Sequence, residues 1–412
     1  MEPNLINFAI PFFFILIFAE IIIGRVRKLK IYRLSDSISD LSSGIVSQIV
    51  GVFIKFLGLM GYAYIYEKAR LFSWDPSSWL TWTIALIGQD FFYYWAHRLS
   101  HEVNLLWAAH VVHHQSEEYN LTVALRQSAF QGLFTQFVYF PLAILGIPPL
   151  HFLVAGQISL IYQFWIHTQV IGKMGFLEYF LNTPSHHRVH HAINPQYIDK
   201  NHGGTLIIWD KLFGTFAPEE ESCVYGTVKP LKSYNVLWAN FHYYKDIWEL
   251  AKKADRLIDK IKVWFAMPGW VPASKGTEAY QKEVPKVTPE SFVKYNPIMS
   301  KSLTIYVVFW FVFLALITFA FLFFWQKLLS WQMWALGFYI IFSLLSLGGI
   351  TEGKNWSLFT EALRFVILMI IGWVYFMGFS SILVHLVNVL SLISLLFLTH
   401  HRPEREVIVE GG

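Results

Sequence analysis

The histidines of this chain fall into three short clusters whose spacing suits metal binding. Residues 97–101 read HRLSH, residues 110–114 read HVVHH and residues 187–191 read HRVHH, a repetition that sixteen histidines in 412 residues do not produce by composition alone. On a helix, residues three and four positions apart lie on one face, so each cluster can direct its imidazoles to a common point. The histidines with this spacing are His97, His101, His110, His113, His114, His187, His190 and His191.

Eight convergent imidazoles predict two metal ions, because one tetrahedral site takes only four ligands. Neutral imidazole binds zinc, copper, iron and nickel. The only cysteine, Cys223, cannot supply a cysteine-based zinc or iron–sulfur site. A large cluster made of histidine alone therefore favours a redox pair such as di-iron, although the Glu-x-x-His motifs of the soluble di-iron carboxylate proteins are absent from the sequence.

Long apolar runs separate and position these clusters. Hydrophobic residues make up 55% of the chain and charged residues 15%, against about 25% charged residues in soluble domains. These values argue against a soluble enzyme and against intrinsic disorder, and a net charge of +4 gives no indication of nucleic-acid binding. Because a span needs roughly 20 apolar residues, we predict an all-α integral membrane protein. Its nine predicted transmembrane helices lie near residues 8–24, 41–66, 79–97, 129–147, 150–168, 301–325, 331–349, 358–379 and 381–399.

Basic residues indicate which membrane face carries the histidine clusters. Five of them follow the first apolar run, namely Arg25, Arg27, Lys28, Lys30 and Arg33. Under the positive-inside rule, this arrangement puts the amino terminus outside and the first loop in the cytoplasm. The outer loops then carry Lys68, Arg70 and Lys327 as their only basic residues. All three clusters reach the cytoplasmic face in this topology, as a shared metal site requires.

Composition divides the chain into five regions. They are an anchor helix with its basic loop (1–40), a catalytic region with the three clusters (41–225), a cytoplasmic polar connector (226–300), a four-span membrane block (301–400) and a cytoplasmic tail (401–412). The connector contains a lysine-rich helical piece, for which we expect a solvated surface near anionic lipid headgroups. We assign no chemistry to the four-span block.

Motifs around the clusters resemble a known family. Asp90-Phe-Phe-Tyr-Tyr-Trp95 precedes the first cluster, and Asn201-His-Gly-Gly and Trp209-Asp210-Lys-Leu-Phe-Gly-Thr215 follow the third. Over residues 40–220 the chain is similar to the fatty acid hydroxylase/sterol desaturase superfamily of integral-membrane di-iron oxygenases. Within it, residues 113–128 and 182–201 are similar to the branch that cleaves glyceryl ethers. His202 is a departure, because that branch is expected to have tyrosine there.

The resemblance implies that the eight cluster histidines bind two iron ions. Three further histidines are candidates for another ligand or for a hydrogen-bond partner of a ligand, namely His167, His186 and His202. Asp90 is a candidate of the same kind, because an unpaired carboxylate inside a predicted span is costly. Five polar residues after the second cluster are candidates for a substrate or reductant pocket, with an ordinary polar surface as the alternative. They are Glu117, Tyr119, Asn120, Arg126 and Gln127.

The resemblance also implies an activity, that of a membrane monooxygenase that uses O2 to hydroxylate a lipid. Hydroxylation beside the ether oxygen of an alkylglycerol gives a hemiacetal, which breaks down to a fatty aldehyde and glycerol. Tetrahydrobiopterin is the implied cofactor, and electrons come from outside the chain, from a tetrahydropterin or from a redox protein. We expect the cell (inner) membrane in a bacterium and the endoplasmic reticulum membrane in a eukaryote, with the active site cytoplasmic.

Two alternatives remain open at the level of sequence. A sterol or fatty-acid hydroxylase or desaturase of the same superfamily would share the metal site and differ in its substrate. A membrane metal transporter or sensor would also need histidines. Transport, however, places ionisable residues along the spans, whereas here they collect at one face of the membrane.

Overall fold

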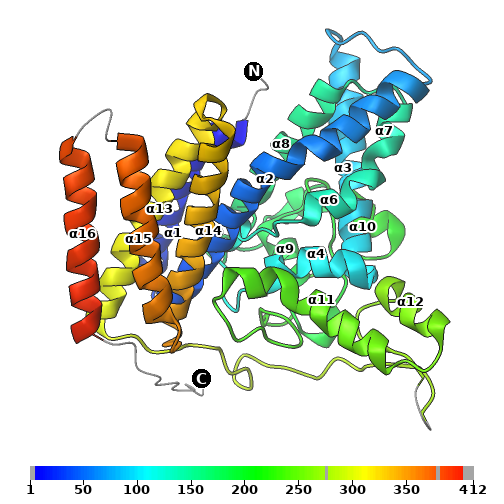
Figure 1. Cartoon of the computed structure of the whole chain (residues 1–412). Helices are drawn as coiled ribbons and strands as arrows, with labels where there is room; N and C mark the ends of the chain where they lie inside the picture. Colours follow the sequence, from blue (N-terminus) through cyan, green and yellow to red (C-terminus); the bar gives the residue numbers. More distant parts are fainter. Residues whose placement is uncertain (1–4, 274–276, 377–380, 402–412) are drawn as a thin grey trace. The chain divides into compact units, whose positions relative to one another are not determined.

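The computed structural model describes residues 5–273, 277–376 and 381–401, and it is mostly helical (Figure 1). It divides into two compact units. Unit 1 contains the described residues up to Leu231 together with Asn240–Phe292, and unit 2 contains Lys232–Ala239 and the described residues from Val293 onward. Most of the lysine-rich part of the predicted connector therefore belongs to unit 1. The predicted tail, residues 401–412, lies outside the described residues except for His401.

Four long helices frame unit 1, namely α1 (Leu5–Val26), α2 (Leu34–Ala69), α3 (Trp79–Glu102) and α8 (Pro149–Trp165). α8 packs along α3 and also contacts α1. Ser78 caps the start of α3, because its hydroxyl accepts the Leu80 N–H at 3.2 Å and satisfies one of the donors left free at a helix start. Its last two turns carry His97 and His101.

Shorter elements of unit 1 include α4 and α9, which carry the second and third histidine clusters. Before residue 232 they are α4 (Asn104–His114), α5 (Leu121–Leu125), α6 (Gln131–Thr135), η1 (Gln136–Tyr139), α7 (Phe140–Ile144), η2 (Gly175–Tyr179), α9 (Pro184–His190), η3 (Pro195–Tyr197) and α10 (Ile208–Phe213). α11 (Val236–Lys253) starts in unit 2 and continues into unit 1, where α12 (Leu257–Phe265) follows it. A short antiparallel ribbon pairs β1 (Trp270–Val271) with β2 (Tyr280–Gln281).

An apolar core joins α2, α3 and α7. Tyr62, Ala85 and Leu142 are fully buried in it, and the Tyr62 hydroxyl donates to the Ile147 carbonyl at 3.0 Å. The chain turns between α7 and α8 at Gly146, whose φ is 86°. A Cβ atom there would lie 2.0 Å from the Phe72 carbonyl oxygen, so this close approach of two backbone segments requires glycine.

Unit 2 is built mainly from α13 (Lys301–Phe324), η4 (Trp325–Lys327), α14 (Ser330–Thr351), α15 (Ser357–Phe376) and α16 (Ser381–His400). Each long helix packs against the next one along the chain, as Figure 1 shows in yellow to red. Arg364 and Glu361 of α15 are fully buried and form an ion pair at 2.6 Å. This region therefore holds a buried polar cluster.

Within the described residues, five helical segments are long and apolar enough to cross a membrane, namely Leu5–Val26, Leu34–Ile54, Lys301–Lys327, Ser330–Thr351 and Ser357–Val374. These segments make the chain a multi-pass membrane protein, and the predicted number of nine is not confirmed. Residues 129–147, predicted as one span, form α6, η1 and α7 in succession. Pro141 lacks the N–H that a continuous α-helix needs there, and Gly146 ends the segment.

Candidate metal centre

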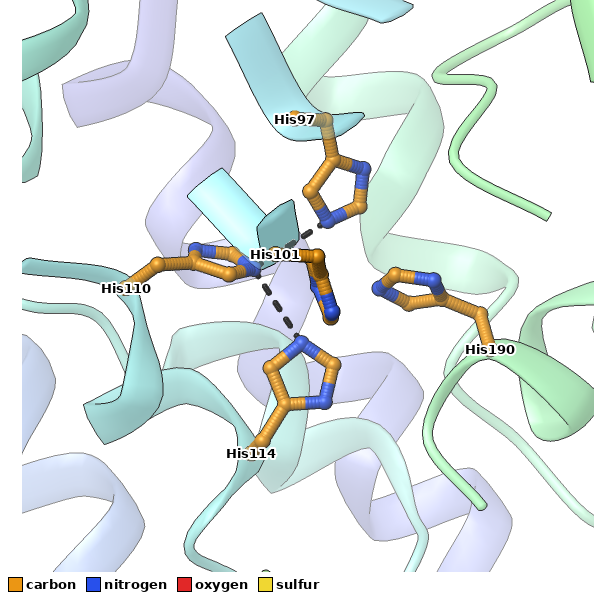
Figure 2. A group of neighbouring side chains, drawn as sticks. All are labelled: His97, His101, His110, His114 and His190. Atoms are coloured by element: carbon orange, nitrogen blue, oxygen red, sulfur yellow. Dashed lines mark hydrogen bonds between the residues drawn. The ribbon is translucent and has the colours of Figure 1, made fainter. Parts of the chain in front are cut away.

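Nine buried histidines form two neighbouring groups. The first group contains His97, His101, His110, His114 and His190 (Figure 2), and the second contains His113, His167, His187 and His191. Within each group, one potential ligand atom from every residue lies within 4.8 Å of those of the others. All eight cluster histidines are thus brought together. His167, from the turn after α8, joins them, which sequence reasoning left open.

The two HxxHH motifs are used reciprocally. In α4, His110 and His114 belong to the first group and His113 to the second. At α9 the order is reversed, because His187 and His191 belong to the second group and His190 to the first. Residues four apart on a helix nearly overlay, whereas a neighbour in sequence points about 100° away. Each motif can therefore serve two metal positions at once.

The separations within the groups match ligands that share an ion. The Nε2 atoms of His97 and His114 each lie 3.1 Å from Nε2 of His110 (Figure 2). In the second group, Nε2 of His167 lies 3.3 Å from Nε2 of His113 and 3.0 Å from Nε2 of His187. Two nitrogens bound at right angles, each about 2.1 Å from one ion, are about 3 Å apart. The residues present therefore fit a pair of metal ions.

Unpartnered nitrogens point to the same conclusion. Nε2 of His101, His190 and His191 is buried and has no hydrogen-bond partner among the described residues. A buried polar atom without a partner costs roughly 1–3 kcal/mol. Three such atoms in a cluster that already contains close nitrogen pairs could each donate a lone pair to a metal ion.

Backbone carbonyls orient four of these nine rings through their Nδ1 atoms, whereas Nδ1 of His110 and of His187 has no hydrogen-bond partner among the described residues. Nδ1 donates to a carbonyl oxygen in His97 with His202 (2.8 Å), His113 with Arg126 (2.8 Å), His190 with Lys200 (2.9 Å) and His167 with Gln163 (2.7 Å). Nδ1 of His101 faces the Asp199 carboxylate at 3.5 Å. A proton held on Nδ1 leaves the lone pair on Nε2, directed into the group. In the four rings whose Nδ1 faces a carbonyl, the fold therefore selects the tautomer that a metal ligand needs.

Burial keeps the imidazoles neutral. It lowers the pKa of His110 to about 3 and that of His113 to about 4. Burial, reinforced by neighbouring histidines, also holds the pKa of His114, His190 and His191 well below the ordinary value. Only a neutral imidazole can donate a lone pair to a metal. The groups are therefore in their metal-binding form at neutral pH.

Two aspartates hold the loop behind the first group. The Asp90 carboxylate accepts the N–H groups of Thr205 (2.7 Å) and Leu206 (3.1 Å) and the Trp209 indole N–H (2.9 Å). Asp210 accepts the N–H groups of His202 and Gly203, each at 2.7 Å. This loop presents the His202 carbonyl to His97. Asp90 thus orients His97 indirectly, by holding this loop. Asp210, which the sequence indicated only as part of a motif, holds the same loop at His202 and Gly203.

The two other candidate histidines lie in different surroundings. The His202 ring lies 5.0 Å from the His101 ring, and neither of its nitrogens has a hydrogen-bond partner among the described residues. His186 is outside both groups. Its Nδ1 atom lies 3.2 Å from the Leu181 carbonyl oxygen, and its ring meets the edge of Phe216. His202 is therefore adjacent to the first group, whereas His186 belongs to neither group.

The five candidates for a pocket mostly form hydrogen bonds or ion pairs with other segments of the chain near the histidines. The Tyr119 ring packs 5.3 Å from the His191 ring, and its hydroxyl donates to the Ile166 carbonyl. The other contacts are Arg126 with Asp40 (3.1 Å), Asn120 with the Ile31 carbonyl (2.7 Å), Glu117 with Arg33 (3.5 Å) and Gln127 with the Ala124 carbonyl (3.0 Å). A role for these residues in a pocket remains a prediction.

Comparison with known proteins agrees with this geometry. Residues 82–215 match the family model described as fatty acid hydroxylase. The chain is 43% identical to alkylglycerol monooxygenase of Homo sapiens over 309 residues, which cover 74% of this chain and 68% of that protein. It is 40% identical to alkylglycerol monooxygenase of Danio rerio over 373 residues, 90% of this chain and 82% of that protein. No solved structure matches the chain. The resemblance seen in the sequence is thereby confirmed, and the chain belongs to the alkylglycerol monooxygenase family of membrane-bound lipid monooxygenases.

Proposed function

We propose that each histidine group holds one iron ion, with five histidines around one position and four around the other. The observation that carries this proposal is the convergence of nine buried, neutral imidazoles from α3, α4, α9 and the turn after α8. The carbonyl contacts at Nδ1 support it, because they orient the rings before any metal binds.

The proposed reaction is the O2-dependent cleavage of an alkylglycerol. An iron pair supplies the activation of O2 that amino-acid side chains cannot provide. One oxygen atom enters the C–H bond beside the ether oxygen, and the other leaves as water with two protons and two electrons from an external donor. The resulting hemiacetal loses glycerol to give a fatty aldehyde. The chain's own residues orient the ligands and keep the site dry.

The proposed substrate is inferred from the relatives, and the proposed electron donor from the resemblance seen in the sequence. Both relatives, at 43% and 40% identity, are alkylglycerol monooxygenases, and a tetrahydropterin is the proposed electron donor. A different substrate in the same superfamily is the natural competitor, since the chain is also 34% identical over 134 residues to ornithine lipid hydroxylase OlsE of Rhizobium tropici.

A purified-protein assay tests this proposal. The full chain is incubated with an alkylglycerol and O2, with and without a tetrahydropterin, and fatty aldehyde is measured. Aldehyde that depends on the tetrahydropterin is the expected result. A hydroxylated fatty acid, sterol or ornithine lipid, formed under conditions in which the ether lipid stays intact, would reject the substrate and keep the metal site.

We also propose that the histidine groups face the cytoplasm, in the membrane of a bacterial cell or of the endoplasmic reticulum. Cys223 is a poor probe of this topology, because burial and the Glu219 carboxylate raise the pKa of its thiol to about 12. Exposed cysteines introduced by Ser77→Cys and Lys229→Cys, each in a Cys223→Ser background, avoid that problem. An impermeant thiol reagent applied to the outside of sealed membranes should label the first and spare the second, and the reverse pattern would invert the topology.

A further inference from the structure

Helix α12 carries an apolar face that nothing in unit 1 covers. Leu257, Ile258, Ile261 and Phe265 are exposed to 74%, 64%, 51% and 61%. Their spacing of one, four and eight residues places all four within a face about 100° wide on an α-helix. Four large apolar side chains side by side on one short helix are unusual for a water-exposed surface.

The opposite face of α12 is fixed to the helix that carries three of the histidines. Val263 is fully buried, with Ala108 of α4 and Ala251 of α11 in the same core. The Asn104 side chain, at the start of α4, donates to the Val263 carbonyl at 2.8 Å, and its backbone N–H donates to the Ala266 carbonyl at 2.9 Å. Because α4 holds His110, His113 and His114, any surface that binds α12 also positions the metal centre.

Basic side chains border the apolar face. On the helical wheel, Lys260 and Lys262 fall on its two edges. Residues 252–262 contain five basic residues and two acidic ones. Of the acidic pair, Asp259 is buried and Asp255 is exposed. An apolar face edged with lysine is complementary to an anionic lipid surface, where the stems lie along the acyl boundary and the ammonium groups reach the headgroups.

We propose that α12 lies in the headgroup region of the bilayer that the chain spans, with its apolar face toward the acyl chains and its lysines at anionic headgroups. The spans hold the protein at the bilayer, so this contact forms at high effective concentration. A soluble protein partner is less suited, since a single short helix offers it little area. Through α4, the contact holds the histidine groups at the depth of the lipid headgroups. If the proposed function holds, that is also the depth of an ether-lipid substrate.

Spin labelling measures the depth of α12 directly. Full-length protein with a nitroxide at Ile261→Cys, in a Cys223→Ser background, is reconstituted into phosphatidylcholine vesicles containing phosphatidylserine. The nitroxide should collide more often with O2, which concentrates in the bilayer, than with a water-soluble nickel chelate. A nitroxide at Lys229→Cys, whose native side chain is 79% exposed, should show the opposite preference. Adding Lys260→Glu and Lys262→Glu should shift the label at 261 toward the nickel chelate when phosphatidylserine is present.

Two outcomes overturn the proposal. If the label at 261 is as accessible to the nickel chelate as the label at 229, α12 lies in water. If labels at 261 broaden one another's spectra, a second copy of the chain covers the face. None of these readouts requires turnover, so failure here leaves the proposed function standing. Equally, failure of the aldehyde assay leaves the position of α12 standing.

Discussion

The histidine groups of unit 1 and the polar cluster around Arg364 in unit 2 both place polar side chains inside an apolar helical frame. In unit 2 the partners are other side chains. The guanidinium of Arg364 donates to both oxygens of Glu361, at 2.9 and 2.6 Å, and lies 4.4 Å from the Trp310 ring centre. The Tyr306 hydroxyl donates to the same carboxylate.

The histidine groups differ in that their partners lie behind the rings. Backbone carbonyls accept from Nδ1 in four of the nine rings, and the Nε2 atoms face one another or have no partner among the described residues. The opposite charges of the unit 2 cluster neutralise one another, although Nη1 of Arg364 has no hydrogen-bond partner among the described residues. A cluster of neutral imidazoles whose lone pairs converge is complete only with a cation. The comparison teaches that burial alone does not identify a site. What separates the two clusters is that the unsatisfied nitrogens of the histidine groups carry lone pairs that converge.

The largest expected effect is a loss of turnover in unit 1 without a loss of folding. His113→Ala removes a ligand atom of the second group and should lower turnover by at least about 100-fold, with matching loss of iron. The protein should still insert, because the spans do not depend on this residue. Iron per chain and aldehyde formation are the measurements, with the exposed His385→Ala as the matched control. Substantial turnover in His113→Ala would remove that residue from the ligand set.

In unit 2 we expect a substitution to lower stability and leave the iron content unchanged. Glu361→Gln leaves the buried Arg364 charge without its anion and should destabilise the protein by about 3 kcal/mol, seen as a lower midpoint of thermal unfolding in detergent. Iron content should stay normal. The double variant Glu361→Leu with Arg364→Met removes both charges and should recover most of the loss. A normal midpoint in Glu361→Gln would show that the ion pair contributes little.

Acid should distinguish the two clusters. A histidine has a pKa near 6.5 in the unfolded chain, whereas burial lowers it to about 3 in His110 and about 4 in His113. Below pH 6.5 the unfolded metal-free chain therefore binds more protons than the folded one. The unfolding free energy of the metal-free protein should be highest above pH 6.5. As the pH is lowered below that value, it should fall by about 1.4 kcal/mol per pH unit for each such histidine.

Chemical denaturation of the metal-free protein at neutral and mildly acidic pH measures this fall. The double variant of unit 2, Glu361→Leu with Arg364→Met, should show the same pH dependence as the parent chain, since its substitutions leave the histidines intact. A metal-free protein whose stability is flat or rises on acidification would mean that the imidazoles are not held neutral by burial.

The smallest effect concerns the loop behind His97. Asp210→Asn replaces one of the two oxygens that accept the N–H groups of His202 and Gly203, and should loosen the carbonyl that orients His97. We expect about a tenfold loss of iron affinity, measured by competition with a chelator. Leu212→Ala, at an exposed position in the same short helix, is the control. Equal affinity in the two variants would assign Asp210 a purely structural role.

The spacing of His110, His113 and His114 and its repeat at His187 already predicted that these side chains converge, because side-chain directions on a helix follow from backbone geometry. Apolar runs likewise predicted the long helices α1, α2, α13, α14 and α15, since length and hydropathy are local properties. The motif residues around these clusters were sufficient to identify the family. Each of these inferences depends on neighbours in the chain.

Only the tertiary structure decided how the histidines divide between two positions and that His167 joins them. The reason is that convergence depends on how α3, α4, α8 and α9 pack, which no local pattern encodes. The carbonyls behind the rings were equally invisible, because every residue has one and only the fold aims it. Residues 129–147 showed the same limit, since their apolar composition predicted a span that Pro141 and Gly146 interrupt.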